Sequence, residues 1–159
     1  MLKLVELTQG DARDVGTVDA LMKAAFDPRY GEGWTPGQCL GVLALPGVWL
    51  TLAHFDGRPV GFSLARAVPF SAGGGEAELL LIATQPKARR CGVGAALLRA
   101  VIDEARGRGA ARLHLEVRAN NDAIPLYTAH GFAKVGERRD YYRPAGGRAY
   151  DAHTYARDL

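Results

Sequence analysis

The stretch from residue 76 to residue 117 restricts the fold of this chain more than any other part of the sequence. It begins with the apolar run "EAELLLIAT" (76–84), which has the length and composition of a strand. It ends with "ARLHLEV" (111–117), where apolar and polar residues alternate as in a half-buried strand. Between them, "GVGAALLRAVIDEARGRG" (92–109) has the period of an amphipathic helix closed by glycine. A strand, a helix and a strand in succession favour a right-handed parallel crossover, so we predict a mixed α/β sheet.

Short strands and helices surround this crossover. Before it, "VWLTLAHF" (48–55) and "PVGFSLARAV" (59–68) flank a turn and are typical of a hairpin. A strand at 3–7 and two helices come earlier, the second helix with Thr35 as N-cap and Pro36 in its first turn. After the crossover, a short helix and two more strands are predicted at 122–130, 132–139 and 149–159. We expect a mostly antiparallel sheet of six or seven strands with a parallel central crossover and about four flanking helices, in one domain over residues 1–159.

Composition sets limits on the partners of the chain. The 159 residues are 48% hydrophobic, which suits one domain with a single core. The net charge of +3 is mild and basic residues alternate with acidic ones, which argues against direct nucleic-acid binding. No apolar run reaches the roughly 18 residues of a membrane span, and the amino terminus turns polar too early for a secretory signal, so we expect a cytoplasmic protein with no membrane partner. Cys39 and Cys91 lack metal-ligand spacing, which indicates free thiols and no metal site.

The turn "RRCGVG" at 89–94, directly before the long helix, is the first candidate binding site. A helix start carries unpaired N–H groups and the positive end of the helix dipole, so it attracts anions. Glycine lets a phosphate approach the backbone, and arginine adds charge-assisted hydrogen bonds. A dinucleotide fingerprint is excluded because Leu97 stands where its third glycine or alanine belongs, and a triphosphate loop is excluded because Gly-Lys-Ser/Thr is absent. The alternative is that Gly92 and Gly94 only allow close packing of the helix on a strand.

Two motifs in this chain resemble those of the GNAT superfamily of N-acetyltransferases. The pattern R-x-x-G-x-G opening a long helix resembles that family's acetyl-coenzyme A motif. The run "LEVRANNDAIPLYTAHGF" (115–132), the later "RRDYYRP" (138–144) and Trp34 are more narrowly similar to the ribosomal-protein alanine N-acetyltransferases. The resemblance implies transfer of acetyl from acetyl-CoA to a primary amine, with the N-terminus of a ribosomal protein as the acceptor.

The same resemblance implies which residues bind the coenzyme. Backbone groups of Ile82, Ala83 and Thr84 would bind the pantetheine arm. The pyrophosphate would lie on the turn made of Arg89, Arg90, Cys91, Gly92, Val93, Gly94 and Ala95. Asn120 would fill the family's asparagine position, but the spacing after Val117 is one residue shorter than usual, so Asn121 stays an alternative.

Two residues are candidates for proton transfer. The alternation in 113–117 places His114 and Glu116 on the face opposite the apolar residues, so Glu116 could accept the amine proton, although a solvent-facing carboxylate has the same pattern. Tyr127 carries a phenol able to protonate a thiolate, although a Leu-Tyr pair in a helix is more often part of a core. The resemblance implies that Glu116 is the general base, and that Tyr127 is the general acid and also contacts the coenzyme.

Three questions stay open at this level. A coenzyme-binding regulatory module without catalysis would need the glycine turn alone. Within enzymes, a lysine side chain or a small-molecule amine is an alternative acceptor, although deprotonating lysine costs about 3.5 kcal/mol more than deprotonating an α-amine. The sequence does not decide whether residues 138–151 contribute to the acceptor groove.

Overall fold

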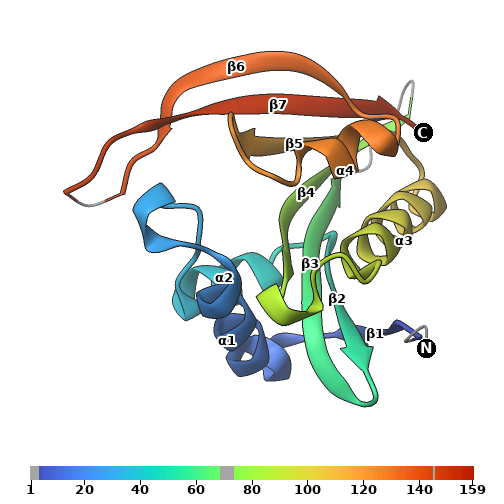
Figure 1. Ribbon diagram of the computed structural model, residues 1–159. Helices are drawn as coiled ribbons and strands as arrows, with labels where there is room; N and C mark the ends of the chain where they lie inside the picture. The colour runs from blue at the N-terminus through green and yellow to red at the C-terminus, as the bar shows by residue number, and fades with distance from the viewer. Residues whose placement is uncertain (1–3, 69–73, 145) are drawn as a thin grey trace.

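The computed structural model describes residues 4–68, 74–144 and 146–159, and its seven strands form one sheet (Figure 1). The strand order is β1-β2-β3-β4-β5-β7-β6, with β4 and β5 parallel and every other neighbouring pair antiparallel. The elements are β1 (Glu6–Gly10), α1 (Val15–Ala25), α2 (Pro36–Leu43), β2 (Val48–Phe55), β3 (Arg58–Val68), β4 (Gly75–Thr84), α3 (Val93–Gly107), β5 (Ala110–Arg118), α4 (Ile124–Ala129), β6 (Ala133–Tyr142) and β7 (Tyr150–Asp158). The predicted mixed sheet, its parallel crossover and the four flanking helices are confirmed.

Three predicted boundaries were wrong, one of them the end of β6, which was expected at residue 139 and lies at Tyr142. The first strand was expected at 3–7 but β1 is Glu6–Gly10, because its position is set by antiparallel pairing with β2 rather than by its own weak alternation. The glycine run at 73–75 was expected to be a loop, yet Gly75 already belongs to β4, and Gly73 lies outside the described residues.

Helix α2 shows why local sequence predicted its start correctly. The Thr35 side chain accepts a hydrogen bond from the Gln38 amide, and the Gln38 side chain accepts one from the Thr35 amide. Pro36 occupies the first turn, where its missing N–H costs nothing. These interactions involve neighbours in the chain only, so a sequence pattern is enough to predict them.

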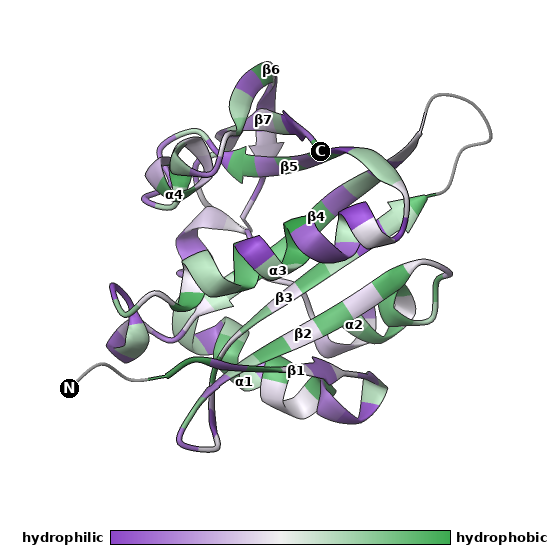
Figure 2. Ribbon diagram, turned by 90° about the vertical axis from the view of Figure 1, so that its right-hand side faces the viewer, coloured by the Kyte–Doolittle hydropathy of each residue, from purple (hydrophilic) through white to green (hydrophobic). Residues whose placement is uncertain are grey.

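The helices cover both faces of the sheet. Helices α1 and α2 pack on one face of β2, β3 and β4, and α3 packs on the other (Figure 1). Figure 2 shows hydrophobic residues concentrated along these central strands, whereas α3 carries both hydrophobic and hydrophilic residues. The face predicted for α3 is fully buried, and it consists of Leu97, Leu98, Val101, Ile102 and Ala105.

A register shift in β4 opens the sheet beside β5. Leu64 pairs with Leu81, but the next residue of β3, Ala65, pairs with Leu79, so Leu80 is an extra residue. Pairing of β4 with β5 covers Gly75 to Leu79 and goes no further. The carboxyl-terminal half of β4 therefore bonds to β3 alone, and its backbone on the β5 side faces an opening. A bulge commonly bends a strand and ends its pairing in this way.

Candidate active site

A cavity of about 1230 Å³ occupies the opening between β4 and β5. It is lined by the ends of these two strands, the start of α3, the segment from α4 back to Asn120, the loop after α1 and two tyrosines of β6. Of the residues singled out from sequence, those lining it are Trp34, Ile82, Ala83, Thr84, Arg89, Arg90, Gly92, Val93, Gly94, Ala95, Glu116, Asn120, Asn121 and Tyr127. Cys91 is the exception: it is exposed, and its sulfur lies 3.5 Å from the Arg89 carbonyl oxygen.

The turn before α3 has the backbone geometry of an anion site. Gly92, the N-cap, has a φ of 82°, a conformation that glycine adopts at little cost. The first helical hydrogen bond runs from the Ala96 amide to the Gly92 carbonyl, so the three amides between them have no partner within the helix. The Val93 side chain is buried in the core, which leaves its amide as the group available to a ligand.

Gly94 lies where the helix start approaches α4 most closely. A Cβ at this position would stand 3.2 Å from Leu126 Cδ2 and 3.9 Å from Thr84 Oγ1. A side chain here would project between the end of β4 and α4, across the entrance that a phosphate would use. Close packing of the helix and access for a ligand, the two explanations considered for Gly94, therefore both follow from its position.

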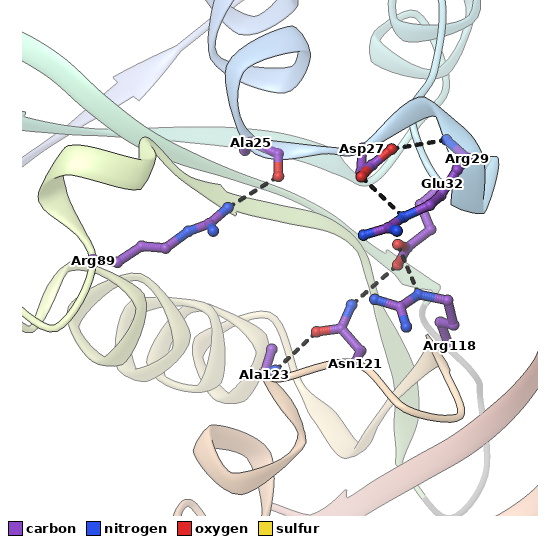
Figure 3. A network of polar contacts seen from close by, with 8 residues as sticks. All are labelled: Ala25, Asp27, Arg29, Glu32, Arg89, Arg118, Asn121 and Ala123. Atoms are coloured by element: carbon purple, nitrogen blue, oxygen red, sulfur yellow. Dashed lines mark hydrogen bonds and ion pairs between the residues drawn. The ribbon is translucent and has the colours of Figure 1, made fainter.

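The two arginines of the turn are arranged differently. Arg89 donates from Nη2 to the carbonyl oxygen of Ala25 at 2.9 Å, which joins the turn to the end of α1 (Figure 3). Arg90 is exposed and has a positive φ of 61°. Arg89 thus contacts the loop that leads to the other end of the cavity.

Glu116 lies on the cavity side of β5 as the alternation predicted. Leu113, Leu115 and Val117 are buried on the opposite face. The Glu116 side chain is 13% exposed; its Oε1 accepts a hydrogen bond from Thr154 Oγ1 at 3.0 Å and lies 3.2 Å from Nε of Arg138. Its Oε2 is buried and has no hydrogen-bond partner among the described residues. The carboxylate is therefore held at one oxygen, and its other oxygen is buried and unpaired among the described residues.

Tyr127 is buried, as the ordinary interpretation of a Leu-Tyr pair in a helix predicts, and it also lines the cavity. Its ring packs edge-on against Phe132 with centroids 6.1 Å apart. Burial, with a smaller contribution from the negative charge of Glu32, raises the pKa of the phenol well above its ordinary value. Tyr127 consequently keeps its proton at neutral pH and can donate it.

Asn120 and Asn121 have different surroundings. The Asn121 side chain accepts a hydrogen bond from the Ala123 amide at 2.8 Å and donates one to Glu32 Oε2 at 3.0 Å (Figure 3). It thereby shapes the turn that leads into α4. Asn120 and Asn121 both line the cavity, and of the two, Asn121 is the one whose side chain makes these described hydrogen bonds.

Glu32 is at the centre of a buried polar network that joins three segments. Its Oε1 lies 3.1 Å from Nε of Arg118, and both side chains are almost completely buried. The Arg118 guanidinium stacks 3.6 Å from the centroid of the Tyr30 ring, and that ring contacts Tyr150 of β7 edge-on. The network fixes the loop after α1 against the end of β5 and, through Asn121, against the start of α4 (Figure 3).

Sequence reasoning missed three cavity residues. Glu32 lies in an irregular loop without periodicity, and Glu78 looks like an ordinary polar position of an alternating strand. Glu78 pairs at 3.7 Å with His114, which the alternation placed on the same face as Glu116. Tyr142 was quoted only as part of a motif, and burial, followed by the charge of Glu32, raises its pKa. A sequence signal was available for Tyr142 alone, in the paired tyrosines of "RRDYYRP".

Some ligand types find no support in the described residues. Within residues 4–68, 74–144 and 146–159, no three His, Cys, Asp or Glu side chains are grouped so that they could hold a metal ion. No helix in those ranges has the length and apolar character needed to cross a membrane. Cys39 is buried, Cys91 is exposed, and both are free.

Two comparisons of sequence identify the family of this chain. Residues 18–132 match the model of the acetyltransferase (GNAT) family. The N-alpha-acetyltransferase RimI of Mycobacterium tuberculosis is 36% identical over 157 residues, which cover 96% of this chain and 89% of that protein. The ribosomal protein bS18-alanine N-acetyltransferase of Escherichia coli is 50% identical over 74 residues, 46% of this chain and 50% of that protein.

Solved structures share the whole fold. The crystal structure of the ribosomal-protein-S18-alanine N-acetyltransferase from Escherichia coli has a TM-score of 0.83 and 29% identity, covering 98% of this chain and 94% of that chain. Arabidopsis thaliana NAA60 in complex with acetyl-CoA has a TM-score of 0.82 at 18% identity, covering 98% and 99%, and shows likeness of fold alone. The chain therefore belongs to the acetyltransferase (GNAT) family, and it is an N-acetyltransferase.

Proposed function

We propose that this chain transfers acetyl from acetyl-CoA to the α-amine of a protein N-terminus, and that its acceptor is the N-terminal alanine of ribosomal protein bS18. The relatives named for that reaction in Escherichia coli support the acceptor. A ribosomal acceptor implies a reaction in the cytoplasm. We treat residues 1–159 as one domain that carries both halves of the site, because all seven strands belong to one sheet.

The observation that carries the proposal is the arrangement of one cavity. One end of it has the open amides of the α3 start, and the other has a carboxylate with a free buried oxygen and a buried, protonated phenol. An anion site at a helix start fits a pyrophosphate. The unpaired edge of β4 offers backbone groups of Ile82, Ala83 and Thr84 to an extended pantetheine arm.

The chemistry follows from the properties of these side chains. Glu116 takes a proton from the acceptor ammonium, directly or through one water, so that the amine lone pair can attack the thioester carbonyl carbon. As the carbon–sulfur bond breaks, Tyr127 gives its proton to the departing thiolate, and the proton that the new amide nitrogen loses restores the phenol. The phenol carries the proton that this role requires, although burial, by raising its pKa, makes it a weaker acid than a free tyrosine. Asn120, which lines the same cavity, is the better candidate for a coenzyme contact, because Asn121 is already engaged with Glu32 and Ala123.

Mass spectrometry tests the acceptor. A synthetic peptide with the N-terminal sequence of bS18 is incubated with the protein and acetyl-CoA, and we expect one acetyl group on the α-amine. The control is the same peptide with its α-amine blocked and its lysines free, which should stay unmodified. Acetylation of the blocked peptide, or turnover of a small amine without any product on the free peptide, would refute the proposed acceptor.

A further inference from the structure

The carboxylate of Glu116 lies in a row of residues that crosses three strands. Glu116 of β5 pairs with Thr154 of β7, and Thr154 pairs with Gly136 of β6. Paired residues in a sheet project on the same face, so the Thr154 hydroxyl stands beside the carboxylate. Gly136 has no side chain, and this leaves the surface beyond Thr154 open.

Arg138 reaches the carboxylate across this open position. It lies two residues after Gly136 on β6, therefore on the same face, and pairs with the small residue Ala152 of β7. Its Nε comes within 3.2 Å of Glu116 Oε1, although β7 separates the two strands. Its guanidinium also lies 5.4 Å from the centroid of the Tyr141 ring, which lines the cavity.

Both contacts fall on the same oxygen. Thr154 and Arg138 bind Oε1, whereas Oε2 is buried without a partner among the described residues. The terminal torsion of a glutamate is soft, so a carboxylate held by neither neighbour would exchange its two oxygens and turn between several directions. A hydrogen bond from Thr154 and an ion pair with Arg138 on the same oxygen favour a single orientation.

We propose that Thr154 and Arg138 are positioning residues that hold Glu116 with Oε2 as the atom that accepts the amine proton. The inference rests on the proposed role of Glu116 as the general base. In the step concerned, one N–H bond of the acceptor ammonium breaks, its electron pair stays on nitrogen, and the proton bonds to Oε2. The neutral glutamic acid then returns that proton to water. Oε1 stays bonded to Thr154 and Arg138 throughout.

The other charged groups near this part of the cavity are engaged elsewhere. His114, on the same face of β5, faces Glu78, and Arg118 is bound to Glu32. Glu137 of β6 pairs with Lys134 and His153. Among the described ion pairs, Arg138 is therefore the cation that contacts Glu116. Because the Arg138 side chain is 62% exposed, its removal should leave the fold intact.

The proposal is tested by steady-state kinetics with acetyl-CoA and any acceptor amine that the protein acetylates. Thr154→Val removes the hydroxyl at nearly constant volume, and Arg138→Met removes the charge. We expect each to lower kcat about 10-fold to 100-fold, the usual size for a mispositioned catalytic group. The KM for acceptor and the Kd for acetyl-CoA should change less than about 2-fold, because neither contact is made to substrate. Thr154→Ser should restore kcat, and Arg138→Lys should restore part of it.

Two controls separate positioning from a general structural effect. Lys134 is a cation on β6, the strand of Arg138, and it pairs with Glu137. Lys134→Met should therefore leave kcat at the wild-type value. In a Glu116→Ala background, Thr154→Val should produce no further loss, because a residue that acts through Glu116 has nothing left to position.

The outcomes distinguish this inference from the proposed function. Wild-type kcat in both Thr154→Val and Arg138→Met, with Glu116→Ala impaired, would overturn the positioning role and leave the base assignment standing. A further loss from Thr154→Val in the Glu116→Ala background would also overturn it. Full turnover by Glu116→Ala would overturn the base assignment and the positioning role together. Failure of the bS18 peptide as a substrate affects only the acceptor, since any amine that is turned over serves for these measurements.

Discussion

Replacing Arg118 by methionine should destabilise the fold far more than losing a surface ion pair does. The Arg118 side chain is 9% exposed and that of Glu32 is 11% exposed, with Nε and Oε1 3.1 Å apart. Methionine keeps much of the volume of the arginine stem but removes the charge. The Glu32 carboxylate would then be left buried with the Asn121 amide as its hydrogen-bond donor.

The expected magnitude follows from this burial. Removing one partner of a buried ion pair typically costs about 3–5 kcal/mol, because the remaining charge stays in a poorly solvated place. Loss of the stacking on the Tyr30 ring, 3.6 Å away, acts in the same direction. When Glu32→Gln is added to Arg118→Met, no unpaired charge remains, so the double variant should be more stable than the sum of the single effects predicts. We expect a coupling of about 1–3 kcal/mol.

Equilibrium unfolding in urea, at pH 7 and two salt concentrations, measures these values. The control is Lys23→Met, which removes an exposed partner of Asp19 on α1, where the lysine side chain is 76% exposed. That change should cost at most about 0.5 kcal/mol and respond to salt. A cost below about 1 kcal/mol for Arg118→Met, together with an additive double variant, would show that the buried network does not hold these segments together.

Three further changes have defined outcomes. Tyr127→Phe should lower kcat about 10-fold to 1000-fold with little change in Tm, and unchanged turnover under chemistry-limited conditions would return this tyrosine to a purely structural role. Gly94→Glu should abolish acetyl-CoA binding in calorimetry. Its circular dichroism should stay native, since the Cβ of the new side chain would lie 3.2 Å from Leu126 Cδ2 and needs only a small shift of Leu126. Unchanged affinity for acetyl-CoA would refute the site. Interaction with the Glu78 carboxylate, whose Oε2 lies 3.7 Å from His114 Nε2, raises the pKa of His114 in spite of burial. The stability from the protonated form is therefore present below the ordinary value of about 6.5 and is lost as pH rises through the raised value. Glu78→Gln should therefore destabilise the protein more at pH 5.5 than at pH 8 in urea titrations, and an equal effect at both pH values would contradict this assignment.

Sequence periodicity predicted the parts of this protein that depend on neighbours in the chain. The buried face of α3 follows from the 3.6-residue period of its leucines, and the start of α2 follows from the reciprocal bonds of Thr35 and Gln38. The alternation in β5 placed Glu116 opposite the buried Leu115. These features depend either on contacts between residues at most four positions apart or on the burial of one face of a helix or strand. The local sequence is therefore sufficient to predict them.

Candidate site residues could be predicted from the sequence where the residue types themselves restrict the chemistry. Glycine and arginine before a long helix indicated an anion site, and the turn has the open amides that this requires. Whether those amides bind a pyrophosphate stays a prediction. The resemblance to the GNAT family is confirmed, and the assignments of Glu116 and Tyr127 remain to be tested by the variants above.

Tertiary structure alone decided how the two halves of the site meet. The bulge at Leu80 opens β4 from β5, and no periodicity in "ELLLIAT" indicates it, because residues 79–83 are all apolar. Glu32 is 86 residues from Arg118 in the chain, and Arg138 reaches Glu116 across an intervening strand. Such contacts depend on strand order and register, which arise from the packing of the entire sheet. Short-range sequence patterns do not contain this information, so the residues that hold the proposed base and the loop after α1 in place could be identified only in the folded chain.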